Sequence, residues 1–106
     1  MNFDEFVQAA REMIAKYVNV SLPELTETLL ARELCPGDVE PESVVRSCGT
    51  WAMRADTALP DGRIYRVEYS CRTDAWMITA YRREAPKNDY IYPDLLPDCG
   101  GVGGRR

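Results

Sequence analysis

Residues 63–84, RIYRVEYSCRTDAWMITAYRRE, alternate apolar and polar side chains more regularly than any other part of the chain. A period of two is that of a β-strand with one buried face. The alternation breaks at Thr73 and Asp74, where a turn would join two antiparallel strands. Residues 50–57, TWAMRADT, have the same period and lead into residues 59–62, LPDG, a turn signal with proline early and glycine late. The sequence therefore predicts a three-stranded antiparallel meander.

A turn centred on residues 73 and 74 fixes which strand residues face one another. Across the second hairpin it predicts three pairs: Cys71 with Trp76, Tyr69 with Ile78, and Val67 with Ala80. Across the first hairpin, a five-residue loop sets the pairs Trp51 with Tyr69, Met53 with Val67, and Ala55 with Tyr65. All of these side chains share one face, and a shift by one residue would turn every one of them into water. We therefore expect this face to be buried.

The second face of the predicted sheet carries the polar half of the alternation. Its members are Thr50, Ala52, Arg54, Asp56, Arg66, Glu68, Ser70, Met77, Thr79 and Tyr81. Arg54 and Arg66 are expected side by side on neighbouring strands, with Tyr81 opposite Arg66. Acidic neighbours are available to both arginines, Asp56 for Arg54 and Glu68 for Arg66. This face stays open to solvent unless another segment lies on it.

Two helices are predicted ahead of the strands. Asn2 and Glu5 have the spacing of a capping box. An apolar stripe follows at helical spacing, made of Phe3, Phe6, Val7, Ala10, Met13, Ile14, Tyr17 and Val18. Ser21 caps a leucine-rich second helix, which ends at Cys35-Pro36-Gly37. A short linker at residues 19 and 20 predicts an antiparallel helix hairpin, packed on the Trp/Tyr/Val face of the meander in a two-layer α+β domain.

Residues 38–49 fit two local structures. Pro41 at a helix start and Gly49 after a helix end favour a short helix through residues 41–48, PESVVRSC. The β-branched pair Val44-Val45 fits the opening of a strand equally well. We predict the short helix.

The length of 106 residues is that of one domain, which we assign to residues 1–89. Residues 90–106 form an extended tail in this prediction. Its first part is apolar and interrupted by prolines, with Tyr90, Ile91, Tyr92, Leu95 and Leu96. We expect residues 90–96 to lie extended against the domain or a partner, and the glycine-rich end to be mobile.

The sequence contains no recognisable catalytic or metal-binding motif. No histidine is present to activate any of the four cysteines, and no GxSxG motif occurs. The cysteines are too widely spaced for a zinc knuckle, so we expect buried structural thiols. The sequence therefore predicts a protein that is not an enzyme and has no catalytic residues, no cofactor and no metal site.

Compartment and membrane association follow from the apolar runs and the N-terminus. The longest apolar runs are far too short to cross a membrane. Asp4 and Glu5 stand where a signal peptide would carry basic residues. We therefore expect a cytoplasmic protein with reduced thiols and no membrane partner.

The net charge of −4 is unevenly distributed along the chain. Residues 1–48 hold nine acidic and four basic residues, whereas residues 49–106 hold eight acidic and nine basic ones. An acidic half suits a protein partner with a basic surface and disfavours nucleic acid as the direct ligand. Small acidic domains without histidine are common among regulatory and inhibitory proteins, including phage-encoded ones that occlude basic nucleic-acid sites. The predicted partner-binding residues are Asp4, Glu5, Glu12, Glu24, Glu27, Arg54, Arg66, Glu68, Tyr81, Tyr90 and Tyr92.

Two alternatives remain at this point. Arginines and a tyrosine on an open sheet face are typical of single-strand nucleic-acid binders, which would use Arg54, Arg66 and Tyr81. A helix over residues 41–48 followed by a β-hairpin also fits a winged-helix module. In addition, an uncovered strand edge favours a symmetric homodimer.

Overall fold

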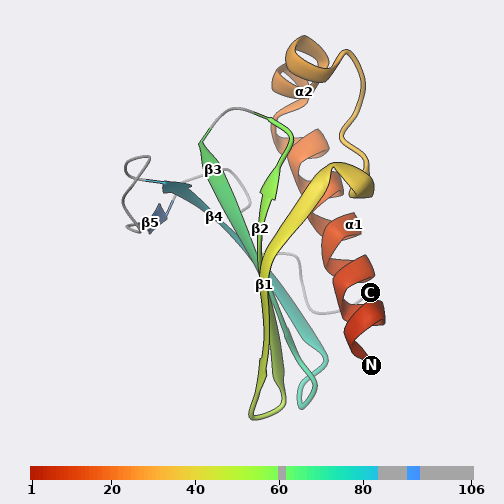
Figure 1. Ribbon diagram of the computed structural model, residues 1–106, viewed down its shortest axis with the longest axis vertical. Coiled ribbons are helices and arrows are strands. Elements are labelled where there is room, and N and C mark those ends of the chain that lie inside the picture. Colours follow the sequence, from red (N-terminus) through yellow and green to blue (C-terminus); the bar gives the residue numbers. More distant parts are fainter. Residues whose placement is uncertain (60–61, 84–90, 94–106) are drawn as a thin grey trace.

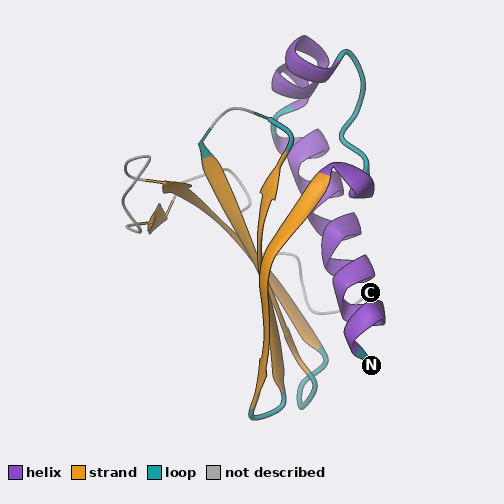
Figure 2. Cartoon of the chain, in the orientation of Figure 1, coloured by secondary structure: helices purple, strands orange, loops and turns teal. Residues whose placement is uncertain are grey.

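One long helix packs along one face of an antiparallel sheet in the computed structural model, which describes residues 1–59, 62–83 and 91–93 (Figures 1 and 2). The helical elements are α1 (Phe3–Ser21), α2 (Pro23–Leu30) and a 3₁₀ turn, η1 (Pro36–Asp38). The strands are β1 (Val39–Ser47), β2 (Thr50–Thr57), β3 (Arg63–Ser70), β4 (Ala75–Arg83) and the short β5 (Ile91–Pro93). Strand order follows the chain, β1-β2-β3-β4-β5, with antiparallel neighbours throughout. The predicted α+β class is confirmed, with more strands than the meander we predicted.

The capping box at the start of α1 is formed as predicted. The Glu5 backbone N–H donates to the Asn2 side-chain oxygen at 2.8 Å, and the Asn2 N–H donates to the Glu5 carboxylate at 3.0 Å. Most of the predicted apolar stripe is buried, but Phe3 at its start is 54% exposed. The buried residues of α1 are Phe6, Ala10, Met13, Ile14, Tyr17 and Val18 of the stripe, together with Ala15. Phe6 lies against both tryptophans of the sheet, with ring centroids 5.3 Å from Trp51 and 5.9 Å from Trp76.

The predicted antiparallel helix hairpin is wrong. Helix α1 continues through Ser21, and Leu22 alone separates it from α2. Reversing direction between two helices takes a loop of about two to five residues, so a single connecting residue leaves no room for a hairpin. Accordingly α2 lies at the upper end of α1 instead of folding back along it (Figure 1). It is also shorter than predicted, ending at Leu30 just before Ala31, which has a φ of 58°.

The first hairpin of the meander has the predicted register. Trp51 pairs with Tyr69, Met53 with Val67 and Ala55 with Tyr65, as the alternation indicated. The second hairpin is shifted by two residues, because the turn spans residues 71–74. The observed pairs are Tyr69 with Trp76, Val67 with Ile78, and Tyr65 with Ala80. A shift of two leaves each side chain on its original face, so Trp76, Ile78 and Ala80 are buried as expected.

The Tyr69 hydroxyl closes this wider turn by donating to the Asp74 carboxylate at 2.9 Å. This hydrogen bond raises the pKa of Tyr69, because it stabilises the protonated phenol.

Residues 41–48 belong to a strand and its turn, so the short helix that we predicted there is wrong. β1 runs from Val39 to Ser47 and reaches β2 through a two-residue turn. Both turn residues have positive φ, 51° at Cys48 and 78° at Gly49, as a type I′ hairpin turn requires. Gly49 therefore marks a hairpin and not a helix end. A β-bulge between Pro41 and Ser43 interrupts the pairing with β2.

Part of the predicted tail joins the sheet. Ile91–Pro93 form β5 along the outer edge of β4, where Arg83 pairs with Ile91, Arg82 with Tyr92 and Tyr81 with Pro93. The extended conformation predicted for residues 90–96 is thus found at residues 91–93. Tyr90, residues 94–96 and the glycine-rich end lie outside the described residues, as does the side chain of Tyr92.

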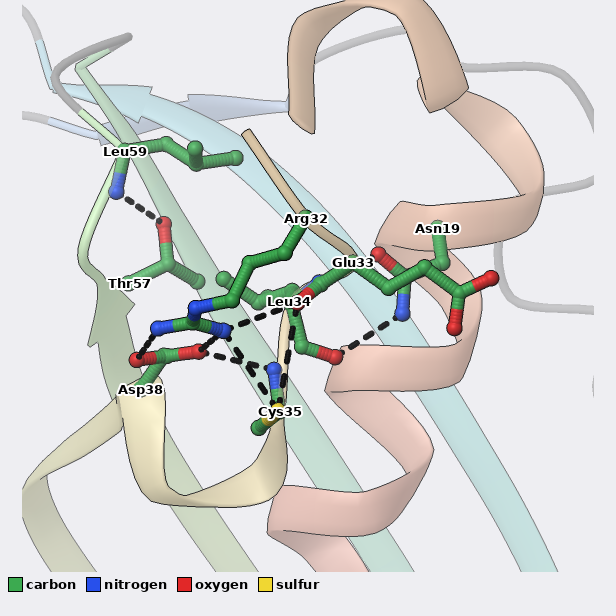
Figure 3. A network of polar contacts seen from close by, with 8 residues as sticks. All are labelled: Asn19, Arg32, Glu33, Leu34, Cys35, Asp38, Thr57 and Leu59. Atoms are coloured by element: carbon green, nitrogen blue, oxygen red, sulfur yellow. Dashed lines mark hydrogen bonds and ion pairs between the residues drawn. The ribbon is translucent and has the colours of Figure 1, made fainter. Parts of the chain in front are cut away.

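A polar network fixes the loop between α2 and β1 (Figure 3). The Arg32 guanidinium makes two hydrogen bonds to the Asp38 carboxylate, at 2.7 and 2.8 Å, and Asp38 also accepts from the Cys35 backbone N–H at 2.8 Å. Asn19 of α1 bonds both the N–H and the carbonyl of Leu34, at 2.8 and 2.9 Å. These contacts hold Leu34 in the core, where it is 3% exposed, and set the position at which β1 begins.

The Asp38→Asn variant should lose a pH-dependent part of the stability. The hydrogen bond from Arg32 lowers the pKa of Asp38 from 3.8 to about 2. A depressed carboxyl pKa stabilises the fold above the unfolded-state pKa, and this contribution is lost as the pH falls from about 4 to about 2. Because half of the Arg32 side chain is exposed, we expect a cost of only about 1 kcal/mol at neutral pH. Urea unfolding from pH 7 to 2 should show the two proteins converging at low pH. A constant difference would contradict this assignment.

Candidate functional site

The face of the sheet turned away from α1 is here called the open face. It carries the partner-binding residues that we predicted on the strands: Arg54, Arg66, Glu68 and Tyr81. Arg54 and Arg66 are direct cross-strand neighbours on β2 and β3, as predicted. The two arginines line two adjoining shallow depressions. The larger one, of about 200 Å³, is completed by Ser43, Val45, Ser47, Thr50, Ala52 and Glu68. The smaller one, of about 100 Å³, is completed by Ile64 and Tyr81.

Carboxylates neutralise both arginines of the open face. The Arg66 Nε lies 2.9 Å from Glu68 Oε2, which is the pairing that the sequence suggested. Arg54 pairs with Glu42 and not with Asp56, at 3.4 Å between Nε and Oε1. Asp56 instead accepts from the backbone N–H of Thr57 at 2.8 Å. The two cations are therefore not a free pair of charges that phosphates could occupy.

Tyr81 does not lie opposite Arg66, contrary to the prediction. The two-residue shift of the second hairpin pairs Tyr81 with Ile64 and Arg66 with Thr79. Tyr81 is half-buried on the open face, whereas Ile64 is only 1% exposed there. Arg66 and Tyr81 still meet around the smaller depression, but without the cross-strand stacking that a direct pair would give.

Exposed apolar side chains flank these ion pairs. Val45 on β1 is 54% exposed and Met77 on β4 is 47% exposed. Val45 pairs with Ala52, Ala52 with Glu68 and Glu68 with Met77, so the four side chains form one row across the sheet. Sequence reasoning missed Val45 and Glu42 on this face because it assigned residues 41–48 to a helix. The β-branched pair Val44-Val45 was the signal that could have found them.

The helical layer carries a second candidate surface, the acidic helical surface, formed by Asp4, Glu5, Glu12 and Glu24. All four side chains are exposed. Asp4, Glu5 and Glu12 share one side of α1, since residues seven or eight apart lie on the same side of a helix. Glu24 lies in the first turn of α2. The side chain of the fifth predicted acid, Glu27, lies outside the described residues.

These four acids have no ion-pair partner in the described part of the chain. Glu5 accepts from the Asn2 backbone within the capping box, and Glu12 accepts from the Gln8 side chain at 2.9 Å. Nearby cations are engaged elsewhere, since Arg11 donates to the Val39 carbonyl at 3.1 Å and Arg32 pairs with Asp38. Lys16 is the exposed cation on α1. The acidic helical surface therefore has four exposed carboxylates against one exposed cation on α1.

The thiols do not assemble a reactive or metal-binding site among the described residues. Cys35, Cys48 and Cys71 are free and exposed, contrary to the buried thiols that we expected. The reason is their position, in the loop before η1 and in the two hairpin turns. Over residues 1–59, 62–83 and 91–93, no three cysteine or carboxylate side chains converge as metal ligands would. No helix among these residues is long and apolar enough to span a membrane.

Comparisons with protein-family models, with curated proteins and with solved structures found no match to this chain.

Proposed function

We propose that this protein is a non-catalytic regulatory or inhibitory domain that binds a protein partner and occludes a basic surface on it. The acidic helical surface is the element that makes this contact. The observation that carries the proposal is the contrast between the two faces of the molecule. The arginines of the open face are neutralised by Glu42 and Glu68, whereas the carboxylates of Asp4, Glu12 and Glu24 face solvent with no ion-pair partner among the described residues.

Charge complementarity of this kind acts mainly on association rate and on partner choice. Exposed carboxylates attract a basic partner over roughly one Debye length, about 10 Å at 0.1 M salt. A basic surface that handles nucleic acid is one that such a domain would cover in competition with phosphates. Three exposed free thiols suit a reducing compartment, which supports a cytoplasmic location.

A charge-neutralised variant tests this proposal. Asp4→Asn, Glu12→Gln and Glu24→Gln together remove three charges from the acidic helical surface. We expect affinity capture from a lysate of the source cells at 50 mM salt to retain a basic protein on the parent chain, and at least about tenfold less of it on this variant. Retention should also fall sharply at 500 mM salt, since screening weakens contacts between exposed charges.

The matched control removes the same number of charges from the open face, with Glu42→Gln, Asp56→Asn and Glu68→Gln. It should retain the partner at the parent level. Equal retention by all three proteins, or retention that does not depend on salt, would show that the acidic helical surface is not the binding site.

Single-strand nucleic-acid binding through Arg54, Arg66 and Tyr81 is the second candidate. The observation in its favour is the pair of depressions that these residues line. The ion pairs to Glu42 and Glu68 oppose it, because phosphate contacts would have to displace them. Fluorescence anisotropy with labelled oligonucleotides separates the two functions. A signal at micromolar protein and low salt that is lost in Arg54→Gln would favour nucleic acid. The winged-helix alternative has no support, because it needs a helix over residues 41–48 and residues 41–47 lie in β1.

A further inference from the structure

Strand β1 forms an edge of the sheet that carries no further strand in the described part of the chain. The strand order places β1 at one end, beside β2 alone. The side chains of Val45, Arg46 and Ser47 are exposed. The opposite edge differs, because β5 lies along the end of β4. The backbone groups on the outer side of β1 are therefore available to another strand.

Natural sheets protect such edges with proline, bulges or projecting charges. β1 has such protection only in its first half, where Pro41 and the bulge before Ser43 interrupt the regular ladder. From Ser43 to Ser47 the strand is regular and carries one charge, that of Arg46. The Arg46 guanidinium carbon lies 5.3 Å from the centre of the Trp51 ring, so this charge is held over a side chain of its own sheet.

The hairpin turn fixes which backbone groups of this segment point outward. In a two-residue turn, the residues that flank it form a hydrogen-bonded pair, here Ser47 with Thr50. Alternation along the ladder then directs the N–H and C=O groups of Ser43 and Val45 toward β2. Those of Val44 and Arg46 point away from the sheet, toward whatever lies along the edge.

We propose that Ser43–Ser47 pairs in antiparallel fashion with the same segment of a second copy, about a two-fold axis at Val45. Two neighbouring registers also bring outward groups together, and both are less favourable. An axis at Arg46 would set two like charges opposite each other. An axis at Val44 would draw the bulge next to Pro41 into the ladder. The axis at Val45 overlaps the whole regular segment with itself.

In this register Val44 of each copy exchanges main-chain hydrogen bonds with Arg46 of the other. Val45 faces Val45 of the second copy as a close, non-hydrogen-bonded pair, which buries a side chain that is 54% exposed in the single chain. The interface joins two sheets edge to edge and is smaller than a standard interface of roughly 1,600 Å². We therefore expect reversible association. Val45 is not one of the acids of the acidic helical surface, so its variants test the dimer without changing the carboxylates on which the proposed function rests.

Opposite charges at position 45 test this register. Sedimentation velocity of the parent chain over a range of concentrations should show a monomer–dimer equilibrium. Val45→Lys and Val45→Glu should each weaken the dimer at least about tenfold, because the self-pair places like charges face to face. An equimolar mixture of the two variants should dimerise at least as well as the parent chain. Recovery on mixing is specific to a two-fold axis through this residue.

Met77→Lys is the matched control, since Met77 is the other exposed apolar side chain in the same row of the open face. It should leave the dimer unchanged. Loss of the dimer in Met77→Lys would assign association to the open face and overturn the edge pairing. A parent chain that stays monomeric at all concentrations, or a mixture of the Val45 variants that does not recover, would overturn it as well.

Discussion

Replacing Phe6 by alanine is expected to lower the free energy of unfolding by about 3–5 kcal/mol. The Phe6 side chain is 0% exposed, and its ring stacks on Trp51 with an interplanar angle of 25° and on Trp76 with an angle of 10°. Alanine would remove both ring contacts and leave a cavity between α1 and the sheet. A domain of this size is typically stable by about 5–15 kcal/mol, so the variant should be close to its unfolding midpoint in mild denaturant.

Urea unfolding followed by circular dichroism measures this loss, and Phe3→Ala is the matched control. Phe3 lies on the same helix but is 54% exposed, so its truncation should change the free energy of unfolding by no more than about 0.5 kcal/mol. Equal effects of the two substitutions would show that α1 does not place Phe6 between the two tryptophans.

The alternation of residues 50–57 and 63–84 predicted three strands because a strand with one buried face has a strict period of two. It also predicted the register of the first hairpin, because a five-residue loop between the two strands sets Trp51 opposite Tyr69 and Met53 opposite Val67. The sequence pattern did not determine the register of the second hairpin. Turns of two and four residues both keep the faces, so hydrophobic patterning could not choose between them. In the structure the turn has four residues, 71–74.

The course of residues 38–48 could not be settled by local sequence. Pro41 and Gly49 are as compatible with the ends of a helix as with a bulged edge strand and a hairpin turn. The positive φ of Cys48 is unusual for a residue other than glycine, asparagine or aspartate. A Cys-Gly pair is therefore a weaker hairpin signal than Asn-Gly. Pairing with β2, a tertiary contact, selects the strand.

The predicted end of the first helix was wrong for a similar reason. Ser21 and Pro23 form a good helix start in sequence, but the structure lets α1 run through Ser21 and begins α2 directly after Leu22. Local signals placed Pro23 in the first turn of α2, but Ser21, which we predicted as its cap, is the last residue of α1. They did not show that the preceding helix would continue up to α2, which is what removes the hairpin.

For the candidate site, the sequence predicted which residues share the open face better than it predicted their partners. The neighbours Arg54 and Arg66 and the Arg66–Glu68 ion pair followed from the period of two. The Arg54–Glu42 ion pair did not, because Glu42 lies beside a bulge that patterning does not reveal. Exposure of the acids on α1 followed from the helical stripe, since residues opposite the buried side of an amphipathic helix face solvent.

Helix α1 covers one face of the sheet, whereas Val45 and Met77 on the other face are exposed to solvent and to partners. Ile78 and Met77 are adjacent on β4 and point to opposite faces, and they are 0% and 47% exposed. Ile78→Lys would place an ammonium group in the core, where no carboxylate is among the buried residues that the structure describes. We expect a loss of at least about 4 kcal/mol, enough to unfold much of the protein.

Met77→Lys introduces the same charge one residue away and should change the free energy of unfolding by no more than about 0.5 kcal/mol. The urea unfolding curves of these two variants, measured beside the parent chain, are the most direct test of the assignment of the faces. The structure predicts an unfolded or strongly destabilised Ile78→Lys and a Met77→Lys that unfolds like the parent. Similar stability of the two variants would contradict it.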